Sequence, residues 1–476
     1  MVVAEVLSNI VKQWHELLFY SSFAFTLINT FGAGTRWVTR TIRLVAFIMI
    51  LLFPLLRKFV HYITSESILH RIIYGPNKRN ALDLYLVPPE HKDSKDDLVP
   101  VYVYIGGGGW TVGYRTWALI IGKVFASHGV LLVSVDYRNF PQGTVSNMLT
   151  DVNQAITWVF ENIDQYQGDP RNVHIFGQSA GAHLVALAAI DQAARETYQL
   201  TRAQGMTKVL SSSDLPAQAV EAAHGQAAAD AGLSTPPRHA SRSHPPHHPG
   251  RSQARVAPGT TLTPTLSPTP GREVGKRLSS SEPVVQESTS TTAKNALERS
   301  LMLSKSKHPT TWKLRDIRSL VLLSGPYNVS ALIPHLHERG LYEQVMYCIM
   351  EGELSHNSPY ARVQRRSFRE CRAGNLLPPI YLFHGKVDET IPFQESINFK
   401  EVLEECGADV TLKLYRDRNH TDAVFEDVLS GDNPMLRDTI NVVKHGQEGL
   451  AIKEEANTAG EVPSWRLVMA RYVNPF

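Results

Sequence analysis

Residues 173–183 of this 476-residue chain read VHIFGQSAGAH. A short apolar run typical of a buried strand meets an alanine-rich run with helical character, and the motif Gly177-Gln178-Ser179-Ala180-Gly181 joins them. A turn this tight leaves little room for side chains two residues before and two residues after the serine, which explains both glycines. The turn also exposes the serine hydroxyl and directs the next backbone amide, that of Ala180, toward a developing oxyanion. The motif therefore predicts a nucleophile at Ser179, against the alternative of a purely structural turn.

The pattern of apolar runs continues from this motif in both directions. Runs that predict buried strands lie at Val101–Ile105, Val130–Val135, Val173–Phe176, Ser319–Leu323, Pro379–Phe383 and Val410–Tyr415. Helical patterns alternate with them at Trp117–Ser127, Met148–Ile163, Ala180–Ala194 and Phe393–Glu405, and again after Thr421. This alternation predicts the α/β class, with a mostly parallel central sheet flanked by helices. Catalytic residues of such folds lie at the carboxyl ends of the strands.

A run of glycines, Gly106-Gly107-Gly108-Gly109, follows the first of these strands and precedes Trp110. Because glycine has no side chain, backbone amides in this loop can approach a substrate oxygen and supply the second half of an oxyanion hole. A flexible turn and a phosphate-binding loop are the alternatives. The phosphate loop is rejected because no Lys-Ser/Thr pair follows the glycines.

An acid and a base follow two later strands. Asp388 ends the string HGKVD after Pro379–Phe383, and His420 lies in the string NHTD after Val410–Tyr415. An acid in such a loop can orient an imidazole and stabilise it once it is protonated. The order of Ser179, Asp388 and His420 along the chain is the order found in α/β-hydrolases. We therefore predict these three residues as the catalytic triad.

Other histidines and acids compete for two of these roles. His384 is the alternative base, although its place at a strand end before a glycine favours a packing role. His183 lies four residues after the serine on the following helix, and we expect it to line the pocket. Asp417 and Asp422 are alternatives to Asp388, but their closeness to His420 favours loop or capping roles.

The composition limits the partners and cofactors. The net charge is only +3, so nothing in the overall charge indicates a nucleic-acid partner. The three cysteines are too scattered for a disulfide framework or a zinc site, and they predict reduced thiols. The histidine-rich tract between residues 239 and 248 is interpreted as solvated rather than metal-binding. We therefore expect neither a metal nor an organic cofactor.

Residues 1–64 are apolar with few acids, and within them Leu44–Leu56 (LVAFIMILLFPLL) carries no charge. Together with its apolar neighbours, this segment reaches the roughly 17–20 residues that cross a bilayer core. We therefore expect residues 1–64 to anchor the chain in a membrane, with a buried or interfacial helix as the alternative. Pro54 would kink a soluble core helix but is tolerated in membrane helices.

Residues 204–307 are rich in Ser, Pro, Thr, Ala and His and show neither a helical nor a strand period. Such a segment lacks the apolar content to offset its ordering entropy, so it predicts a disordered insert. Strand–helix alternation resumes after it, so the insert interrupts a single catalytic domain, residues 65–448. Residues 449–476 are the expected C-terminal tail.

Several longer strings resemble the plant isoprenylcysteine methylesterases, which are α/β-hydrolases related to the hormone-sensitive-lipase-like carboxylesterases. The strings are DYRNFPQGT (136–144), GQSAGAH (177–183), LSGPYN (323–328), RGLY (339–342) and IMEGE (349–353). The similarity covers about 70–198 and 312–445, the whole predicted folded region. The wider carboxylesterase group has a histidine where this chain has Gly106, but the methylesterases also lack it. The long insert has no expected counterpart in the family.

The resemblance implies functional residues and a substrate. It assigns Ser179, Asp388 and His420 as the triad, and it assigns the carbonyl-binding site to Gly107, Gly108, Gly109, Gln178 and Ala180. It also implies N-terminal membrane segments and hydrolysis of the methyl ester on prenylated cysteine. The expected partners are thus such an ester, or a similar apolar ester, and a membrane of the endoplasmic reticulum or Golgi.

Other functions and the orientation stay open at this point. An arylformamidase or a general carboxylesterase is a second enzyme interpretation, and an inactive α/β-hydrolase receptor is one from another class. Such receptors usually lack the serine or the histidine, and both are present here. Basic residues after Leu44–Leu56, few cysteines and the glycosylation sequon Asn419-His420-Thr421 favour a cytoplasmic catalytic domain.

Overall fold

The computed structural model describes residues 35–91, 98–203, 311–451 and 462–474. All of them belong to one compact unit of the chain. The whole predicted disordered insert, residues 204–307, lies outside the described residues, as do residues 1–34 of the predicted membrane anchor.

A central sheet of eight strands carries the fold, in the order β1-β2-β4-β3-β5-β6-β7-β8. The strands are β1 Ile68–Ile73, β2 Ala81–Tyr85, β3 Val99–Ile105, β4 Leu131–Val135, β5 Gly168–Gln178, β6 Ile317–Leu323, β7 Ile380–Gly385 and β8 Val410–Tyr415. Strand β2 pairs antiparallel with β1 and with β4, and all other pairs are parallel. The predicted mostly parallel sheet is confirmed, and all six predicted strands lie in it.

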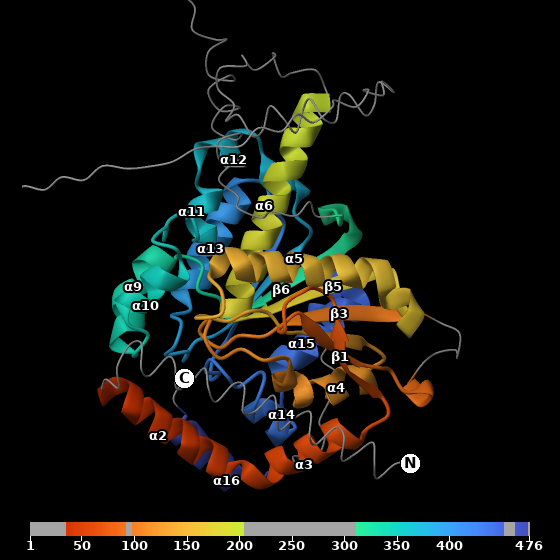
Figure 1. Ribbon diagram of the computed structural model, residues 1–476, viewed down its shortest axis with the longest axis vertical. Helices are drawn as coiled ribbons and strands as arrows, with labels where there is room; N and C mark the ends of the chain where they lie inside the picture. Colours follow the sequence, from red (N-terminus) through yellow and green to blue (C-terminus); the bar gives the residue numbers. More distant parts are fainter. Residues whose placement is uncertain (1–34, 92–97, 204–310, 452–461, 475–476) are drawn as a thin grey trace, which may run out of the picture. The chain divides into compact units, whose positions relative to one another are not determined.

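Helices cover both faces of the sheet (Figure 1). The long helices are α5 Val145–Asn162, α6 Ala180–Ala203 and α13 Gln394–Glu405 on one face, with α4 Gly122–Ser127 and α15 Pro434–His445 on the other. Strand β3 shows why both faces need cover. Val101 and Val103 pack in the core beside α5 and α6, whereas the alternate residue Tyr102 packs with Phe125 of α4 and Phe176.

The order of the strands places a crevice where the site is expected. The chain passes from β3 to β4 on one side, and then returns to form β5 on the other side of β3. Loops after β3 and β5 therefore leave the sheet in opposite directions, which opens a gap at their carboxyl ends. The glycine run follows β3, and Ser179 follows β5.

Strands β1 and β2 were not predicted from the sequence, because charged residues interrupt their apolar pattern. Every residue of β2 is buried, including Asp83 in its centre. The Asp83 carboxylate accepts hydrogen bonds from Arg115 Nε at 2.9 Å and from the Tyr62 hydroxyl at 2.6 Å. In a sequence, an aspartate within a short apolar run indicates a solvated loop, because burying its charge is costly without partners. The partners of Asp83 lie far from it along the chain, so the sequence did not reveal them.

The apolar N-terminal segment forms two helices, α2 Thr35–Ile50 and α3 Leu52–Thr64, which are bent by 74° at a break. Within the described residues no single helix is both long and apolar enough to cross a bilayer, although the bent pair taken together meets those criteria of length and composition. The break has a local cause, because Pro54 lacks the amide hydrogen that would bond Ile50 and its ring crowds that carbonyl. The continuous stretch expected from the sequence is therefore interrupted.

Further helices were not predicted. Between β6 and β7 the chain forms α9 Val329–Glu338, α10 Glu343–Ile349, α11 Pro359–Val363 and α12 Arg366–Glu370. Helix α16 Ser464–Val473, in the expected tail, was not predicted either, whereas α14 Glu426–Ser430 and α15 confirm the helical pattern predicted after Thr421. The helix predicted over Trp117–Ser127 is a 3-10 turn, Arg115–Leu119, followed by the single short helix α4.

Candidate active site

Ser179 lies on the tight turn between β5 and α6, with a φ of +53°. Its amide donates a hydrogen bond to the Leu323 carbonyl at the end of β6, at 2.8 Å. Gly181 packs directly on β3, and a Cβ atom at this position would overlap the Ile105 carbonyl. The close packing holds the serine in the left-handed backbone region that non-glycine residues rarely adopt.

The structure brings the three predicted triad residues together. His420 Nε2 lies 2.9 Å from Ser179 Oγ, and His420 Nδ1 lies 2.8 Å from Asp388 Oδ2. The other Asp388 oxygen accepts the amides of Thr390 and Ile391, each at 2.9 Å. With Asp388 as acceptor, the imidazole donates from Nδ1 and leaves Nε2 to accept the serine proton.

Electrostatics keep the acid ionised. Burial by itself would raise the pKa of Asp388, but His420 and His384 beside it outweigh that effect and hold this pKa well below its ordinary value. A carboxylate that stays charged can stabilise an imidazolium at His420.

The rival residues have other partners. His384 is fully buried, with Nδ1 at 2.7 Å from Ser396 Oγ and Nε2 at 2.9 Å from the Ile391 carbonyl. It stands 3.2 Å from the Asp388 carboxylate and makes no hydrogen bond to the serine. Asp417 is exposed, and Asp422 accepts the Asn419 amide at 2.6 Å instead of approaching the imidazole.

The expectation that His183 lines the pocket is wrong. Its Nδ1 accepts a hydrogen bond from Trp110 Nε1 at 3.2 Å, and its Nε2 donates to the Asn357 carbonyl at 2.7 Å. The ring is fully buried, and this burial lowers the pKa of His183 to about 4. His183 thus stays neutral and fixes the indole of Trp110, which does line the pocket.

Gln178 lines the cavity, and its side chain bridges two loops of the site. Its Oε1 accepts the Gly107 amide at 3.2 Å, and its Nε2 lies 3.5 Å from the His420 carbonyl. The side chain therefore ties the glycine loop to the histidine loop. Among the described residues the amides of Gly108 and Gly109 have no such acceptor, and like the helix-start amide of Ala180 they remain available for a substrate oxygen.

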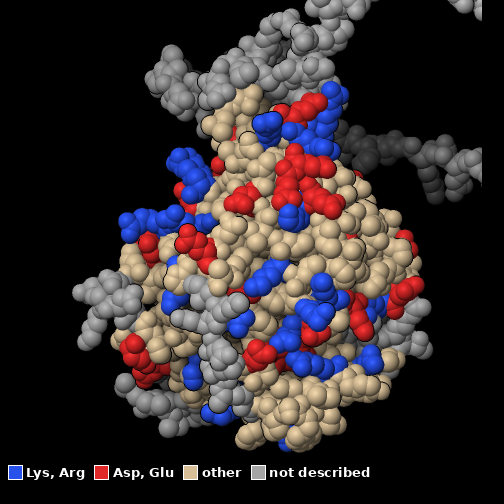
Figure 2. All heavy atoms as spheres, turned by 180° about the vertical axis from the view of Figure 1, so that it is seen from behind, with Lys and Arg blue, Asp and Glu red and all other residues tan. Residues whose placement is uncertain are grey.

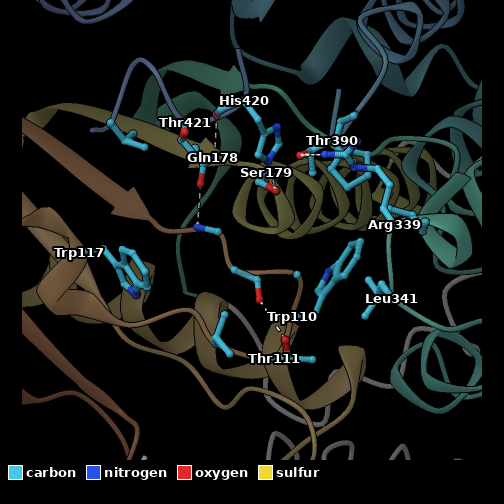
Figure 3. Close-up of a pocket in the computed structure, with 18 of the residues that line it drawn as sticks. Trp110, Thr111, Trp117, Gln178, Ser179, Arg339, Leu341, Thr390, His420 and Thr421 are labelled. Atoms are coloured by element: carbon cyan, nitrogen blue, oxygen red, sulfur yellow. Dashed lines mark hydrogen bonds between the residues drawn. The ribbon is translucent and has the colours of Figure 1, made fainter. Parts of the chain in front are cut away.

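A cavity of about 240 Å³ opens over the serine (Figure 3). Ser179 and His420 face it, with Trp110 and Leu341 on one side and Trp117 on the other. Most of the remaining wall is apolar or glycine, contributed by Leu44, Tyr104, Val112, Pro326, Leu336, Ile391, Val424 and Phe425 among others. Arg339 is the only Asp, Glu, Lys or Arg side chain of the described lining. The cavity is therefore suited to an uncharged, largely apolar group.

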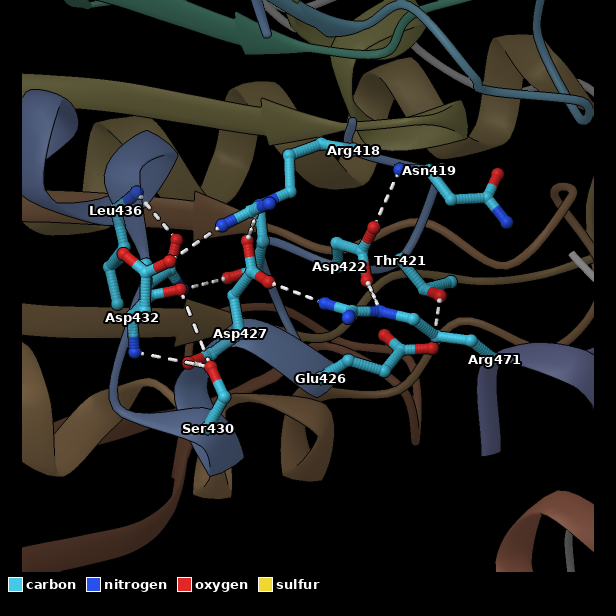
Figure 4. Close-up of polar contacts among 12 residues, drawn as sticks. Arg418, Asn419, Thr421, Asp422, Glu426, Asp427, Ser430, Asp432, Leu436 and Arg471 are labelled. Atoms are coloured by element: carbon cyan, nitrogen blue, oxygen red, sulfur yellow. Dashed lines mark hydrogen bonds and ion pairs between the residues drawn. The ribbon is translucent and has the colours of Figure 1, made fainter. Parts of the chain in front are cut away.

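The loop that carries His420 is held by the C-terminal helix α16 (Figure 4). Arg471 pairs with Asp422 and with Asp427, at 2.9 Å each. Asn474 Nδ2 lies 2.6 Å from both Thr421 Oγ1 and Glu426 Oε1. Burial, reinforced by Asp422, raises the pKa of Glu426 and of Asp427 to about 7. Nothing in the sequence near position 471 indicates this role, because the partners lie more than forty residues away.

No group of three or more His, Cys, Asp or Glu side chains in the described ranges is arranged to hold a metal ion. The histidine-rich tract between residues 239 and 248 lies outside those ranges.

A substitution in the glycine loop should separate the roles of its members. A Cβ at position 107 would lie 2.7 Å from the Ser179 Cβ, whereas one at 109 would have no neighbour nearer than 3.9 Å. We expect Gly107→Ala to slow labelling of the serine by a fluorophosphonate probe by about 10²-fold or more, because the added methyl group displaces the serine and a small displacement of a catalytic group is costly. Gly109→Ala is the matched control, and its labelling rate should stay within about tenfold of the parent rate. Its added methyl group meets no close neighbour, so the only cost is the positive φ of this residue, which alanine adopts less readily than glycine. Equal labelling rates for the two variants would contradict this account of the loop.

Comparison with known proteins agrees with the geometry. The BD-FAE family model, which describes an α/β-hydrolase family, matches residues 82–226. The isoprenylcysteine alpha-carbonyl methylesterase ICME of Arabidopsis thaliana is 29% identical, over 97% of this chain and 82% of that protein. The probable methylesterase ICME of Oryza sativa subsp. japonica is 28% identical, over 97% of this chain and 84% of that protein. Among solved structures, a truncated carbohydrate esterase from gut microbiota is 16% identical with a TM-score of 0.45, over 82% of this chain and 99% of that one.

The whole-length similarity covers the strands that carry the serine, the acid and the histidine, and the relatives are esterases. The chain is a carboxylic ester hydrolase of the α/β-hydrolase fold and a relative of the isoprenylcysteine alpha-carbonyl methylesterases.

Proposed function

We propose that this esterase hydrolyses the methyl ester of prenylated cysteine through an acyl-enzyme on Ser179. The observation that carries the proposal is the apolar cavity that opens directly over the serine and histidine pair. Its aromatic and aliphatic wall suits a prenyl chain, and a methyl ester has no charge that the cavity would need to neutralise. The similarity to the Arabidopsis methylesterase over 97% of this chain supports the same substrate class.

The geometry supports a two-step reaction. Ser179 Oγ attacks the ester carbonyl while His420 Nε2 takes its proton, and Asp388 stabilises the imidazolium that forms. The oxyanion is stabilised by amides of the glycine loop and of Ala180. His420 then returns the proton to the methoxy group, so methanol leaves, and a water molecule activated by His420 hydrolyses the acyl-enzyme.

Three alanine variants test these roles. Ser179→Ala and His420→Ala should each lower kcat by about 10⁴-fold or more, because the members of a triad act as a unit. His384→Ala should cost much less activity, since that ring supports Asp388 from behind and does not reach the serine. The kcat values are compared by steady-state kinetics. The temperature is one at which circular dichroism shows that all three variants are folded. If His384→Ala proves severe and His420→Ala mild, then His384 is the base and our assignment of His420 is wrong.

A substrate panel tests the function itself. Farnesylcysteine methyl ester should have a higher kcat/KM than p-nitrophenyl acetate and than N-formylkynurenine, because only the first fills the apolar cavity. A preference for the formamide would favour an arylformamidase. Failure of Ser179 to react with a fluorophosphonate would favour an inactive receptor, because labelling requires an activated serine.

We also propose a membrane-bound location, at the endoplasmic reticulum or Golgi, with the catalytic domain on the cytoplasmic side. The Asn419 side chain accepts the His420 amide at 2.8 Å, so a glycan attached to Asn419 would disturb the neighbouring base. Protease added to sealed microsomes should therefore digest the domain, and endoglycosidase should not change its mobility. Protection from protease would instead place the catalytic domain on the lumenal side.

A further inference from the structure

Helices α2, α3 and α16 lie together along one edge of the fold, although α16 is far from the others in sequence (Figure 1). Phe47 and Leu51 on the N-terminal side pack with Leu467 and Ala470 of α16 in one buried cluster. The faces turned away from this cluster remain apolar and open. Side chains with about half or more of their surface exposed include Val45 and Met49 of α2, Phe53 and Leu56 of α3, and Val468 and Tyr472 of α16.

The charges on these helices have one sign. None of the three contains Asp or Glu, while Arg43, Arg57 and Arg466 are among their basic residues. Figure 2 shows the same edge, at the bottom of that view, as mostly uncharged atoms with few acidic ones. An apolar face with basic residues and no acids fits the boundary between headgroups and acyl chains of an anionic bilayer.

We infer that the exposed faces of α2, α3 and α16 form one surface that lies in the plane of an anionic membrane, as an alternative to a helix that crosses it. The 74° bend separates α2 from α3, and the hydroxyl of Tyr62 binds Asp83 of the sheet, so α3 is fixed to the catalytic domain. A helix fixed in this way cannot leave the domain to span a bilayer without breaking a buried hydrogen bond.

This surface adjoins the active-site cavity. Leu44 of α2 lines the cavity, while its neighbour Val45 is 54% exposed. Phe425, also in the cavity wall, packs edge-on against Phe47 at 6.2 Å between ring centroids. A lipid-borne chain could therefore pass from the bilayer into the cavity along α2 without crossing water. That consequence rests on the proposed function, but the docking surface does not.

Vesicle co-sedimentation of the full chain, without substrate, tests the surface separately from the substrate. The probe is a vesicle of about three parts phosphatidylcholine to one part phosphatidylserine, against phosphatidylcholine alone. We expect the Leu56→Glu/Val468→Glu variant to bind the anionic vesicles at least about fivefold more weakly than the parent chain. Leu200→Glu on α6 is the matched control, because Leu56 and Leu200 are both 52% exposed, and it should bind like the parent.

Three results would overturn the inference. The parent chain fails to bind anionic vesicles, or the double variant binds as well as the parent, or Leu200→Glu weakens binding equally. Unchanged thermal unfolding of the double variant guards against misfolding, and Val45→Glu/Met49→Glu on α2 provides a second variant of the same surface.

A separate set of contacts concerns the opposite side of α16. We further propose that Arg471 is a positioning residue for the base. Its guanidinium holds Asp422, whose other carboxylate oxygen accepts the Asn419 amide at 2.6 Å, next to His420. This chain of contacts fixes the backbone from which the imidazole projects.

Kinetics separate positioning from stability. Arg471→Gln should lower kcat by at least about tenfold with little change in KM, because small displacements of a catalytic group are costly. Arg471→Lys should recover part of the loss. Arg418→Gln is the matched control, because Arg418 pairs with Asp427 and Asp432 but not with Asp422. Equal kcat losses in the two glutamine variants, or a loss of stability with kcat unchanged in Arg471→Gln, would overturn the proposal.

Discussion

The rest of the site depends on one backbone constraint, the contact of the turn after β5 with the ends of β3 and β6. Gly181 packs on the Ile105 carbonyl, and the Ser179 amide bonds the Leu323 carbonyl. These contacts hold a serine at a φ of +53°, a conformation that costs of the order of 1–3 kcal/mol. The cost is sustained because the strands on both sides are buried and cannot move. Because the sheet fixes the nucleophile, the base and the oxyanion donors must come from loops at the ends of other strands. The glycine loop follows β3, and His420 follows β8.

The parts that the sequence predicted are those that depend on local pattern. Six strands appear as short apolar runs, and the turn that carries Ser179, the glycine loop and the Asp388 and His420 loops follow directly after strands. A parallel sheet brings such loops to one edge whatever lies between them, so the site could be assembled without knowing any distance. Local pattern was not enough for β2, whose central Asp83 is buried, or for α16, whose partners lie far away in the sequence.

The three histidines near the site show where pattern alone stops. His183, His384 and His420 all lie close to the motifs, but their partners differ. One ring fixes Trp110, one supports the acid, and one reaches the serine. Position on a helix suggested that His183 faces the pocket, but a buried carbonyl of Asn357 and an indole donor satisfy both of its nitrogens. The role of a histidine depends on which group accepts a hydrogen bond from one ring nitrogen and which group donates one to the other. These partners are brought to the ring only by the fold.

Under the proposed function, the position of α2 gives the apolar N-terminal region a part in substrate access. A prenyl chain dissolved in lipid loses its favourable environment if it must cross water to reach the serine, at about 0.8 kcal/mol for each exposed methylene. Leu44 of α2 and Phe425 both line the cavity, and Phe425 also packs against Phe47 of α2, so apolar side chains connect this helix with the cavity over the nucleophile. The same helices pack on α16, whose Arg471 holds the loop of His420. Access for the substrate and the placement of the base therefore depend on the same small group of helices.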